Sequence, residues 1–499
     1  MKIISASGDF TQQEVDALII YKTQDTDLQN AAKSVDEALD GAISEIISAG
    51  DFTGSTGETL VIYTRGTIPA KRVIVVGLGE SSKFSADVVR RAAATGVLKA
   101  RSLKLKNVAT RPIGAARKAI SVDSASQAVT EGALLGLYQY HGQKSSDAPE
   151  NLESISIVSD DTAAIDKGIA TGTAFAEGTI LARDLINNPP NVVTPAYMAS
   201  RAEEMAKEVG LKCTVLDKTQ MQALKMGALL GVAQGSDNPP KFIILEHNSD
   251  KKEDNNTIVL VGKGVTFDTG GYSLKTRDGM VGMKADMSGG AAVIGAMKTI
   301  AKLDVPLHVV GLIPASDNMV SSKAYRPEDV LIASNGKSIE IISTDAEGRL
   351  LLADALVYAQ RYNPKAVVDI ATLTGSIMIA LGSAATGVYS NSDDVVAKLE
   401  LAGTFTDEPI WRMPMSEIYG NSLKSDTADT KNSGGAAGRA GGAGVAAHFL
   451  SNFVDYNWAH IDMAGMLRNA GTNPYSPKHS AYGYGARLLA EFARQWSKS

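Results

Sequence analysis

Cysteine is nearly missing from this chain of 499 residues, with Cys213 as the single example. One cysteine can form neither a disulfide within the chain nor a thiolate cluster around zinc, which favours a reducing compartment, the cytoplasm. An excess of positive charge is also lacking, because 49 Lys and Arg residues stand against 55 Asp and Glu residues. The net charge of −6 excludes a chain-wide positive field that would hold a phosphate backbone.

Long apolar runs are absent as well. The most membrane-like stretch, 370–392, is uncharged but contains several Thr, Ser, Asn and Gly residues. A spanning helix needs about 20 predominantly apolar residues, so we expect a buried strand, a loop and a helix there. The first twenty residues mix polar and apolar side chains and lack the core of a signal peptide. The sequence therefore predicts neither a membrane segment nor export.

Short β-branched runs alternate with helical patterns along the chain, and its 44% hydrophobic and 21% charged residues are typical of a globular protein. The pattern predicts an α/β fold whose larger part has a mixed, largely parallel sheet covered by helices. Ligands of such sheets bind beyond the carboxyl ends of the strands. The expected strands are 17–21, 59–63, 72–76, 155–158, 212–216, 242–246, 258–262, 308–313, 339–343, 367–371 and 458–463.

A long helical pattern divides the chain. It runs from Asp160 to Leu185 and must end before Pro189 and Pro190, because proline cannot continue a helix. We interpret this helix as a connector between two domains. The predicted division is a smaller N-terminal α/β domain over 1–161, a connecting helix over 162–190 and a larger C-terminal domain over 191–499.

Acidic residues gather in two segments that each follow an expected strand. Asp268 and Asp286 lie in the first segment, and Asp345 and Glu347 lie two residues apart in the second. In extended backbone, side chains two apart point to the same side. Four carboxylates brought together repel one another unless they are protonated or bind cations, and two divalent ions would neutralise them. Ligation rich in carboxylates suits Mn²⁺, Mg²⁺ or Zn²⁺.

An alternative interpretation is that these acids form surface salt bridges with the basic residues of the same segments, namely Lys263, Lys275, Lys284 and Arg349. The glycines around them, such as Gly262, Gly264 and Gly348, favour a crowded site, because glycine permits close packing. From spacing alone, the pattern indicates a two-metal hydrolase.

The run Ser-Thr-Asp-Ala-Glu-Gly-Arg-Leu at 343–350 resembles the signature of the leucyl aminopeptidase family, also called the cytosol aminopeptidases. The signature begins with asparagine, so Ser343 shortens a side chain beside two candidate ligands and removes an amide. Further family blocks are matched at 187–195, 263–287, 324–330, 371–375, 424–432 and 458–465. The resemblance covers most of 180–480, whereas the first third matches only as a generic α/β domain.

The resemblance implies a ligand set for two metal ions, Mn²⁺ or Zn²⁺. Asp268 and Glu347 would bridge both ions, Lys263 and Asp286 would complete the more tightly held ion, and Asp345 the more exchangeable one. A lysine can bind a metal only as the neutral amine. Its pKa must therefore be depressed by burial and by the adjacent cations.

The resemblance also implies catalytic roles. Lys275 would polarise the scissile carbonyl, and Arg349 would hold a bicarbonate ion that acts as general base. The pocket for the substrate side chain would contain Met283, Thr372, Gly375, Ala464 and Leu467.

The predicted function is a hydrolase, a metal-dependent aminopeptidase that releases N-terminal residues, preferably leucine-like, from peptides in the cytoplasm. The family resemblance further implies a homohexamer. A DNA-binding accessory role, known within the family, is the alternative, and a cluster of basic residues could form its local patch. These residues are Lys99, Arg101, Lys104, Lys106, Arg111, Arg117 and Lys118.

Overall fold

The computed structural model describes residues 1–115, 119–146, 150–250, 256–435, 440–467, 473–476 and 480–498. The chain forms two compact units, one of Met1–Ala176 with Ala470–Lys478 and one of Glu177–Asn469 with His479–Ser499. Helix α5 (Thr162–Asn187) contains the point at which the sequence passes from the first unit to the second. The predicted organisation, a smaller and a larger α/β part, is confirmed. Within the described residues, every helix is too short or too polar to cross a bilayer.

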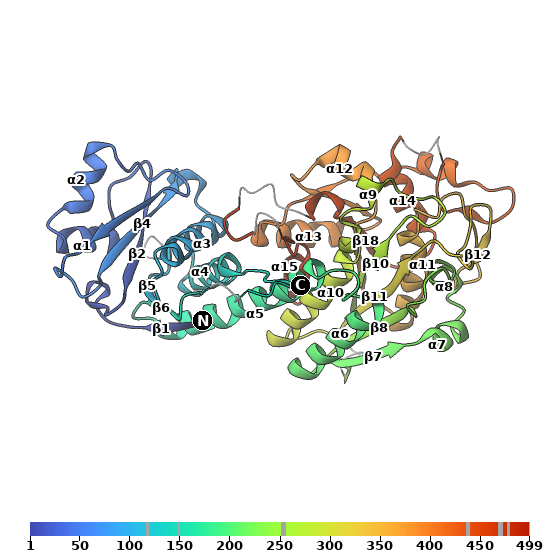
Figure 1. The fold of residues 1–499 in the computed structure, drawn as a ribbon, viewed down its shortest axis with the longest axis horizontal. Coiled ribbons are helices and arrows are strands. Elements are labelled where there is room, and N and C mark those ends of the chain that lie inside the picture. The colour runs from blue at the N-terminus through green and yellow to red at the C-terminus, as the bar shows by residue number, and fades with distance from the viewer. Residues whose placement is uncertain are drawn as a thin grey trace. The chain divides into compact units, whose positions relative to one another are not determined.

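The N-terminal unit contains a six-stranded sheet with the order β1-β6-β5-β2-β4-β3 (Figure 1). Its strands pair in parallel except for β3, which runs antiparallel to β4. The strands are β1 (Lys2–Ala6), β2 (Ala17–Thr23), β3 (Thr59–Tyr63), β4 (Arg72–Gly79), β5 (Asn107–Thr110) and β6 (Ser154–Val158).

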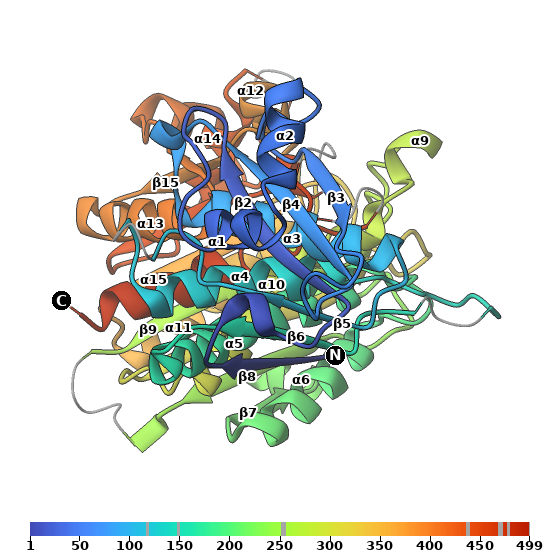
Figure 2. The same ribbon diagram turned by 90° about the vertical axis from the view of Figure 1, so that its left-hand side faces the viewer.

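Alternation along β2 explains how this sheet is covered on both faces. Ala17 and Ile19 join a core with α3 (Ala86–Ser102) and α4 (Val122–Leu137). Leu18 and Ile20 point the other way and join a second core, to which the short helices that follow β2 contribute. These helices, α1 (Ala31–Ala38) and α2 (Ala42–Ala49), lie in front of the sheet in Figure 2. Because strand side chains alternate between faces, a continuous apolar run such as β2 requires cover on both sides.

The second unit includes all the candidate metal-ligand, catalytic and substrate-pocket residues predicted above and is therefore called the catalytic unit. It contains a nine-stranded mixed sheet. Its order is β16-β15-β18-β14-β9-β11-β8-β7, with β10 paired to β11. The strands β18, β14, β9 and β11 are parallel, so their carboxyl ends lie at one edge. The strands are β7 (Lys212–Leu216), β8 (Lys241–His247), β9 (Ile258–Gly262), β10 (Gly264–Asp268), β11 (Val309–Asn318), β14 (Ala366–Ala371), β15 (Thr386–Ser390), β16 (Ile410–Arg412) and β18 (Trp458–Asp462).

Helices cover both faces of this sheet. Val310 and Leu312 of β11 pack into a core with α8 (Gly227–Ala233), α11 (Gly348–Ala359) and α14 (Gly442–Ser451). Gly311, between them, faces α10 (Ser288–Lys302) on the other side, where an added Cβ would lie 2.9 Å from Met297. Helix α15 (Ala486–Trp496) packs against α10, and α6 (Pro195–Val209) packs against β7 and β8. The predicted largely parallel, helix-covered sheet is confirmed.

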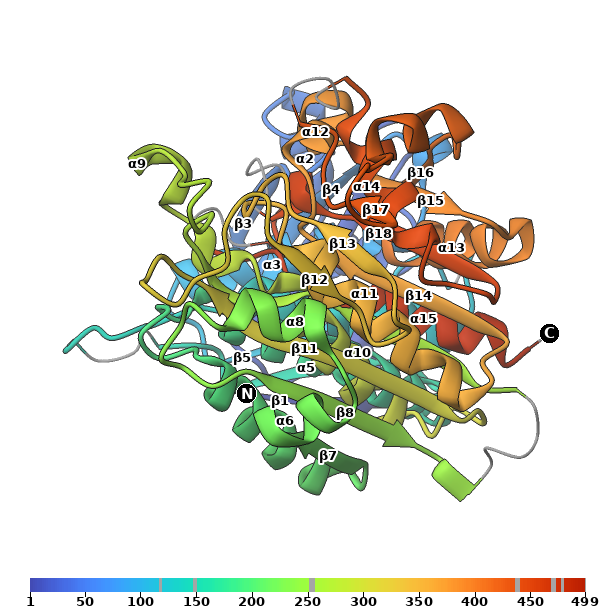
Figure 3. The same cartoon turned by 90° about the vertical axis from the view of Figure 1, so that its right-hand side faces the viewer.

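One predicted strand is wrong both in its bounds and in the sheet to which it belongs. The strand expected at 339–343 is β13 (Ser338–Glu340), and it belongs to a separate small sheet with β12 (Val330–Ile332) and β17 (Thr430–Lys431). Figure 3 shows β12 beside α8, with β13 paired to β12. Beyond Glu340, the amides of Ile342 and Ser343 donate to the side-chain oxygen of Asn432, which replaces a strand partner.

Candidate metal centre and active site

The polar residues of the candidate site follow the carboxyl ends of neighbouring strands in the catalytic unit. Lys263 comes directly after β9, and Asp268 is the last residue of β10. Asp286 follows the single turn η5 (Met283–Ala285) and precedes α10, and Glu347 is the N-cap of α11. The sheet and two helix starts therefore direct these side chains to one place.

Lys263 lies at the centre of a buried group of charges. Its Nζ is 2.8 Å from Asp286 Oδ1 and 2.8 Å from Glu347 Oε1. It also donates to the carbonyl oxygen of Thr372 at 3.2 Å, at the end of β14. The exposed fraction of Lys263 is 3% and that of Glu347 is 1%. These contacts are buried ion pairs, so the surface salt-bridge interpretation does not describe them.

Three carboxylates approach one another closely enough to share a cation. One oxygen each of Asp268, Asp286 and Glu347 lies within 4.8 Å of the other two, and all three side chains are buried. Asp268 is oriented by hydrogen bonds, since its Oδ1 accepts from Asn318 Nδ2 and from the Gly270 amide, each at 2.8 Å. The three carboxylates that the resemblance assigns to the bridging and tightly held positions thus lie together, while their roles as metal ligands stay a prediction.

Lys275 joins the fourth carboxylate to this group. Its Nζ is 2.7 Å from Asp268 Oδ2 and 2.6 Å from Asp345 Oδ1. The Asp345 side chain is 39% exposed, unlike the buried three. The expectation that Asp345 and Glu347 lie in extended backbone is wrong. Asp345 lies in a turn and Glu347 has helical backbone angles (φ −78°, ψ −38°), so the two carboxylates face different lysines.

Burial and mutual repulsion disturb the ionisation of these groups. Burial raises the pKa of Asp286 well above its ordinary value, and burial together with Glu347 raises the pKa of Asp268. Burial by itself would lower the pKa of Lys263, but Asp286 and Glu347 outweigh it and raise that pKa. The expected depression of the Lys263 pKa depends on adjacent cations and stays a prediction, because without them the ammonium faces only carboxylates.

The donor set fits a pair of divalent cations. Within the described residues, Asp286 Oδ2 is buried and accepts no hydrogen bond, and the only charged group beside Glu347 Oε1 is the Lys263 ammonium at 2.8 Å. A buried carboxylate oxygen without a partner is costly unless a cation or a donor satisfies it. Four carboxylates against the two ammonium groups of Lys263 and Lys275 leave a formal charge of −2. Oxygen ligands with one amine suit Mn²⁺, Mg²⁺ or Zn²⁺ better than softer ions.

Glycine is required where α11 begins. A Cβ added to Gly348 would lie 2.4 Å from Lys263 Cε and 2.6 Å from its Nζ. The start of the helix therefore fits against the lysine only because residue 348 has no side chain.

Several residues that support the site have no role in the sequence prediction. Thr344 Oγ1 donates to the Gly270 carbonyl at 2.6 Å, and its own carbonyl accepts from Tyr325 Oη at 2.8 Å. Asn432 Nδ2 donates to the Ser343 carbonyl at 2.6 Å. An amide from a distant segment thus holds the turn in which Ser343 replaces the asparagine of the signature. Tyr325 and Asn432 lie in matched family blocks, which is the only sequence signal for them.

Arg349 lies on the first turn of α11 and is buried, with 8% of its surface exposed. Its Nη1 donates to the Asn432 carbonyl at 2.8 Å, while its buried Nε has no hydrogen-bond acceptor in the described part of the chain. Burial lowers the pKa of Arg349 to about 10. A guanidinium with a spare buried donor is suited to hold a small anion.

Four of the five residues expected around the substrate side chain lie in two adjoining segments, and the fifth, Met283, lies in a third. Thr372 donates to Asp286 Oδ1 at 2.7 Å, which ties the end of β14 to the carboxylates. Asp462, at the end of β18, accepts from the amides of Leu373 and Thr374 and from that of Ala464. Helix α12 (Gly375–Leu381) and the turn η9 (Ala464–Met466) pack together. Asp462 therefore connects the two segments, and Leu467 follows η9 while Met283 begins η5.

The basic cluster of the N-terminal unit is partly neutralised. Lys106 Nζ lies 3.3 Å from Glu150 and 3.7 Å from Glu153. Arg101 donates to the Leu137 carbonyl at 3.3 Å. Two further members, at 117 and 118, lie outside the described residues. The DNA-binding alternative therefore stays a prediction.

Comparisons with known sequences agree over the whole chain. The profile of the cytosol aminopeptidase family's catalytic domain matches residues 180–490, and that of the family's N-terminal domain matches 17–147. A probable cytosol aminopeptidase of Alkaliphilus oremlandii is 41% identical, and one of Roseiflexus castenholzii is 43% identical. Both alignments cover 100% of this chain and 100% of the relative.

Solved structures show the same fold. The bottromycin maturation enzyme BotP in complex with Mn has a TM-score of 0.85 at 32% identity, covering 97% of this chain and 100% of that chain. A mutant of tomato leucine aminopeptidase has a TM-score of 0.87 at 34% identity, covering 99% of this chain and 96% of that chain. The chain therefore belongs to the cytosol aminopeptidase family and is a metal-dependent aminopeptidase, a hydrolase that removes residues from peptide ends.

Proposed function

We propose that this enzyme releases leucine-like N-terminal residues from peptides with the help of two divalent cations. The observation that carries the proposal is the buried group of Asp268, Asp286 and Glu347 around Lys263, in which three carboxylates face one ammonium and Asp286 Oδ2 accepts no hydrogen bond among the described residues. A buried excess of negative charge at a sheet edge is stable only if cations compensate it.

In this proposal each ligand has the role that the family resemblance implies. Asp268 and Glu347 bridge the ions, Lys263 and Asp286 hold the tighter ion, and Asp345 holds the exchangeable one. The half-exposed position of Asp345, compared with the buried Asp286, supports that division. Mn²⁺ and Zn²⁺ are the proposed ions, and the manganese complex of the similar enzyme BotP supports the first.

The bound ions would supply a hydroxide nucleophile near neutral pH and Lewis acidity. Lys275 would place its ammonium against the oxyanion that develops on the scissile carbonyl. Its position between Asp268 and Asp345 supports this role, because those carboxylates raise its pKa against the effect of burial and keep it charged. Arg349 would hold a bicarbonate ion as general base, which its spare buried Nε supports.

The side chain of the first substrate residue would lie near Thr372, Gly375, Ala464, Met283 and Leu467. The hydrogen bonds of Asp462 to both segments support a pocket there. We further propose a homohexamer in the cytosol. The family resemblance supports the assembly, the printed names of the relatives support the location, and light scattering after size-exclusion chromatography tests the assembly.

The decisive experiment measures hydrolysis of leucine amide and of its N-acetylated form after chelation and after re-addition of Mn²⁺ or Zn²⁺. We expect activity only on the free amine, loss on chelation and recovery with the metal. Metal analysis should give two ions per chain. Unchanged rates in the chelated protein, or equal rates on the blocked substrate, would overturn the proposal.

A further inference from the structure

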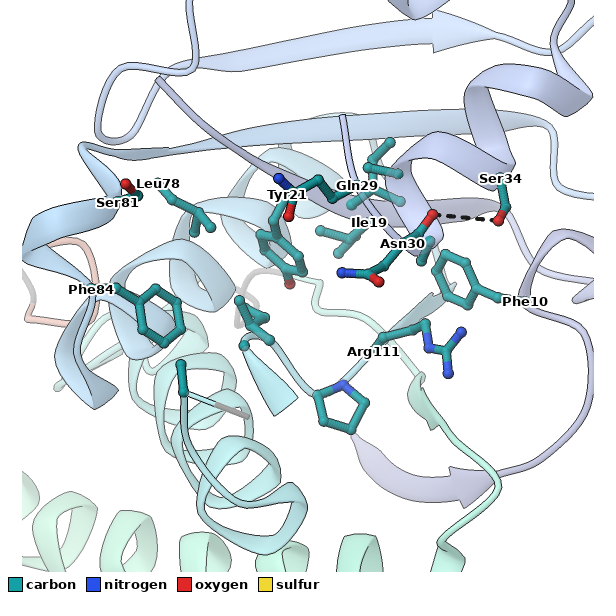
Figure 4. Close-up of a pocket in the computed structure, with 17 residues that line it drawn as sticks. Phe10, Ile19, Tyr21, Gln29, Asn30, Ser34, Leu78, Ser81, Phe84 and Arg111 are labelled. Carbon is teal, nitrogen blue, oxygen red and sulfur yellow. Dashed lines mark hydrogen bonds between the residues drawn. The ribbon is translucent and has the colours of Figure 1, made fainter. Parts of the chain in front are cut away.

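The N-terminal unit contains a cavity of about 460 Å³ that the proposed peptidase activity does not use (Figure 4). It lies beyond the carboxyl half of β2, beside the end of β4 and against the segment that follows β5, where Arg111 lies. The carboxyl ends of strands in an open α/β sheet are the usual place for a ligand. The volume falls within the range of about 300–1,000 Å³ of small-molecule sites.

Aromatic and aliphatic side chains form most of the wall. The rings of Phe10, Tyr21 and Phe84 border the cavity, together with Leu78 and Ile113. Tyr21 is held in place because its hydroxyl is 2.9 Å from Thr110 Oγ1. In Figure 4, Phe10 and Phe84 lie on opposite sides of Tyr21. Such walls favour a flat, apolar group, because rings bury large areas and stack on other rings.

Among the described residues of the lining, Arg111 is the only charged one, and its charge is positive. Arg111 forms no ion pair or hydrogen bond within the described residues. The pKa of nearby Asp9 is lowered mainly by hydrogen bonds from Thr11 and least by the charge of Arg111. The described lining contains neither Asp nor Glu. A free amino acid or a peptide N-terminus carries an ammonium group that would have no partner there. The cavity therefore selects for an anion.

Asn30 adds a second polar feature. It precedes α1 with strained backbone angles (φ 48°, ψ −128°), and its side chain does not cap the helix. In Figure 4 its amide instead points toward Tyr21. Strained residues persist where the surrounding structure over-determines them, often at ligand sites. The Ser34 hydroxyl donates to the Asn30 carbonyl at 3.3 Å, and the positive end of the α1 dipole beside the cavity adds an attraction for an anion.

We propose that this cavity binds a nucleoside monophosphate, with the base between the aromatic walls and the phosphate near Arg111 and the start of α1. Both the aromatic walls and Arg111 are needed to select this ligand, because the walls alone attract any apolar group and Arg111 alone attracts any anion.

The test is calorimetric titration of the full-length, metal-loaded protein with AMP. Adenosine lacks the phosphate and ribose 5-phosphate lacks the base. Each should bind at least about tenfold more weakly than AMP, a difference of about 1.4 kcal/mol. Hydrogen exchange should show AMP-dependent protection at 29–34 and 111–114. Absence of AMP binding, protection confined to the catalytic unit, or equal binding of ribose 5-phosphate would overturn the proposal.

The variant Arg111→Gln should weaken AMP binding about tenfold or more while leucine amide hydrolysis is unchanged. Lys33→Gln is the matched control, because Lys33 lies on α1 with an exposed side chain outside the lining. If Arg111→Gln does not fold, Asn30→Gly gives the same readout, since glycine tolerates a positive φ. Equal AMP affinity in wild type and in the folded variant would contradict the proposal.

Discussion

The two units differ in the charge and polarity of the side chains at the carboxyl ends of their strands. In the catalytic unit, the strand ends carry four carboxylates and two lysines in direct contact, with three carboxylates buried. In the N-terminal unit, the strand ends border a largely apolar cavity whose described lining contains the cation Arg111 and no acid. Both sheets are largely parallel and covered on both faces. The difference shows that the fold provides a ligand site at the ends of the strands, while the few residues after each strand decide which ligand that site suits.

The largest effect should come from removing the Lys275 ammonium group from the catalytic edge. Lys275→Ala should lower kcat for leucine amide by about 10²–10³-fold, because the oxyanion loses a charged partner. Metal content should stay at the wild-type level, since Lys275 is not a proposed ligand. Lys323→Ala, at an exposed lysine, is the control. Wild-type turnover in Lys275→Ala would remove its proposed role.

A smaller loss should follow from filling the space at Gly348. Gly348→Ala places a methyl group against Lys263, and overpacking of this kind costs about 1–3 kcal/mol. We expect a lower unfolding midpoint in urea and weaker metal retention during dialysis. Gly375→Ala serves as the stability control, because its added Cβ meets nothing within 4 Å. Equal stability of the two variants would show that Lys263 moves aside freely.

A carboxylate away from the catalytic edge should affect stability alone. Glu246 of β8 lies opposite the start of β11, and His308 together with Lys212 lowers its pKa to about 2. Its charged form therefore stabilises the fold above about pH 4.5, and this contribution is lost as the pH falls toward 2. Glu246→Gln should cost about 1 kcal/mol at pH 7. Urea unfolding at several pH values checks this, and a constant difference between wild type and variant down to pH 3 would contradict it.

The smallest effect should come from restoring the signature. Ser343→Asn should change kcat/KM for leucine amide by less than about threefold, which corresponds to less than about 0.7 kcal/mol. The reason is that Asn432 already holds this turn through its side-chain amide. A change of tenfold or more would show that the signature asparagine acts on the metal site directly.

The sequence predicts the strands better than the segments between them. The bounds of β3, β7 and β9 agree with the expectation, because β-branched runs between turn residues specify a strand locally. The segment after Glu340 fails, because Asn432, about ninety residues away, satisfies its amides. The local sequence pattern contains no signal for a partner so far along the chain.

The candidate site shows the same limit. The acidic and basic residues that meet at the edge could be identified from their density after strands and from the family signature. The residues that support them could not be identified by their pattern. Asn318 and Tyr325 are ordinary polar residues, and their hydrogen bonds to Asp268 and Thr344 arise only in the folded chain. The turn at Asp345 was missed because the start of α11 overrides the extended geometry assumed from spacing.

Helix α5 has a practical consequence for dissecting this enzyme. A recombinant fragment cut at the division between Ala176 and Glu177 would end or begin inside 26 residues of continuous helix. Each half would expose backbone groups that the intact helix pairs internally, and short helices are marginal on their own. Truncated versions for crystallisation or screening should therefore keep the whole of Thr162–Asn187, whichever part of the enzyme is produced.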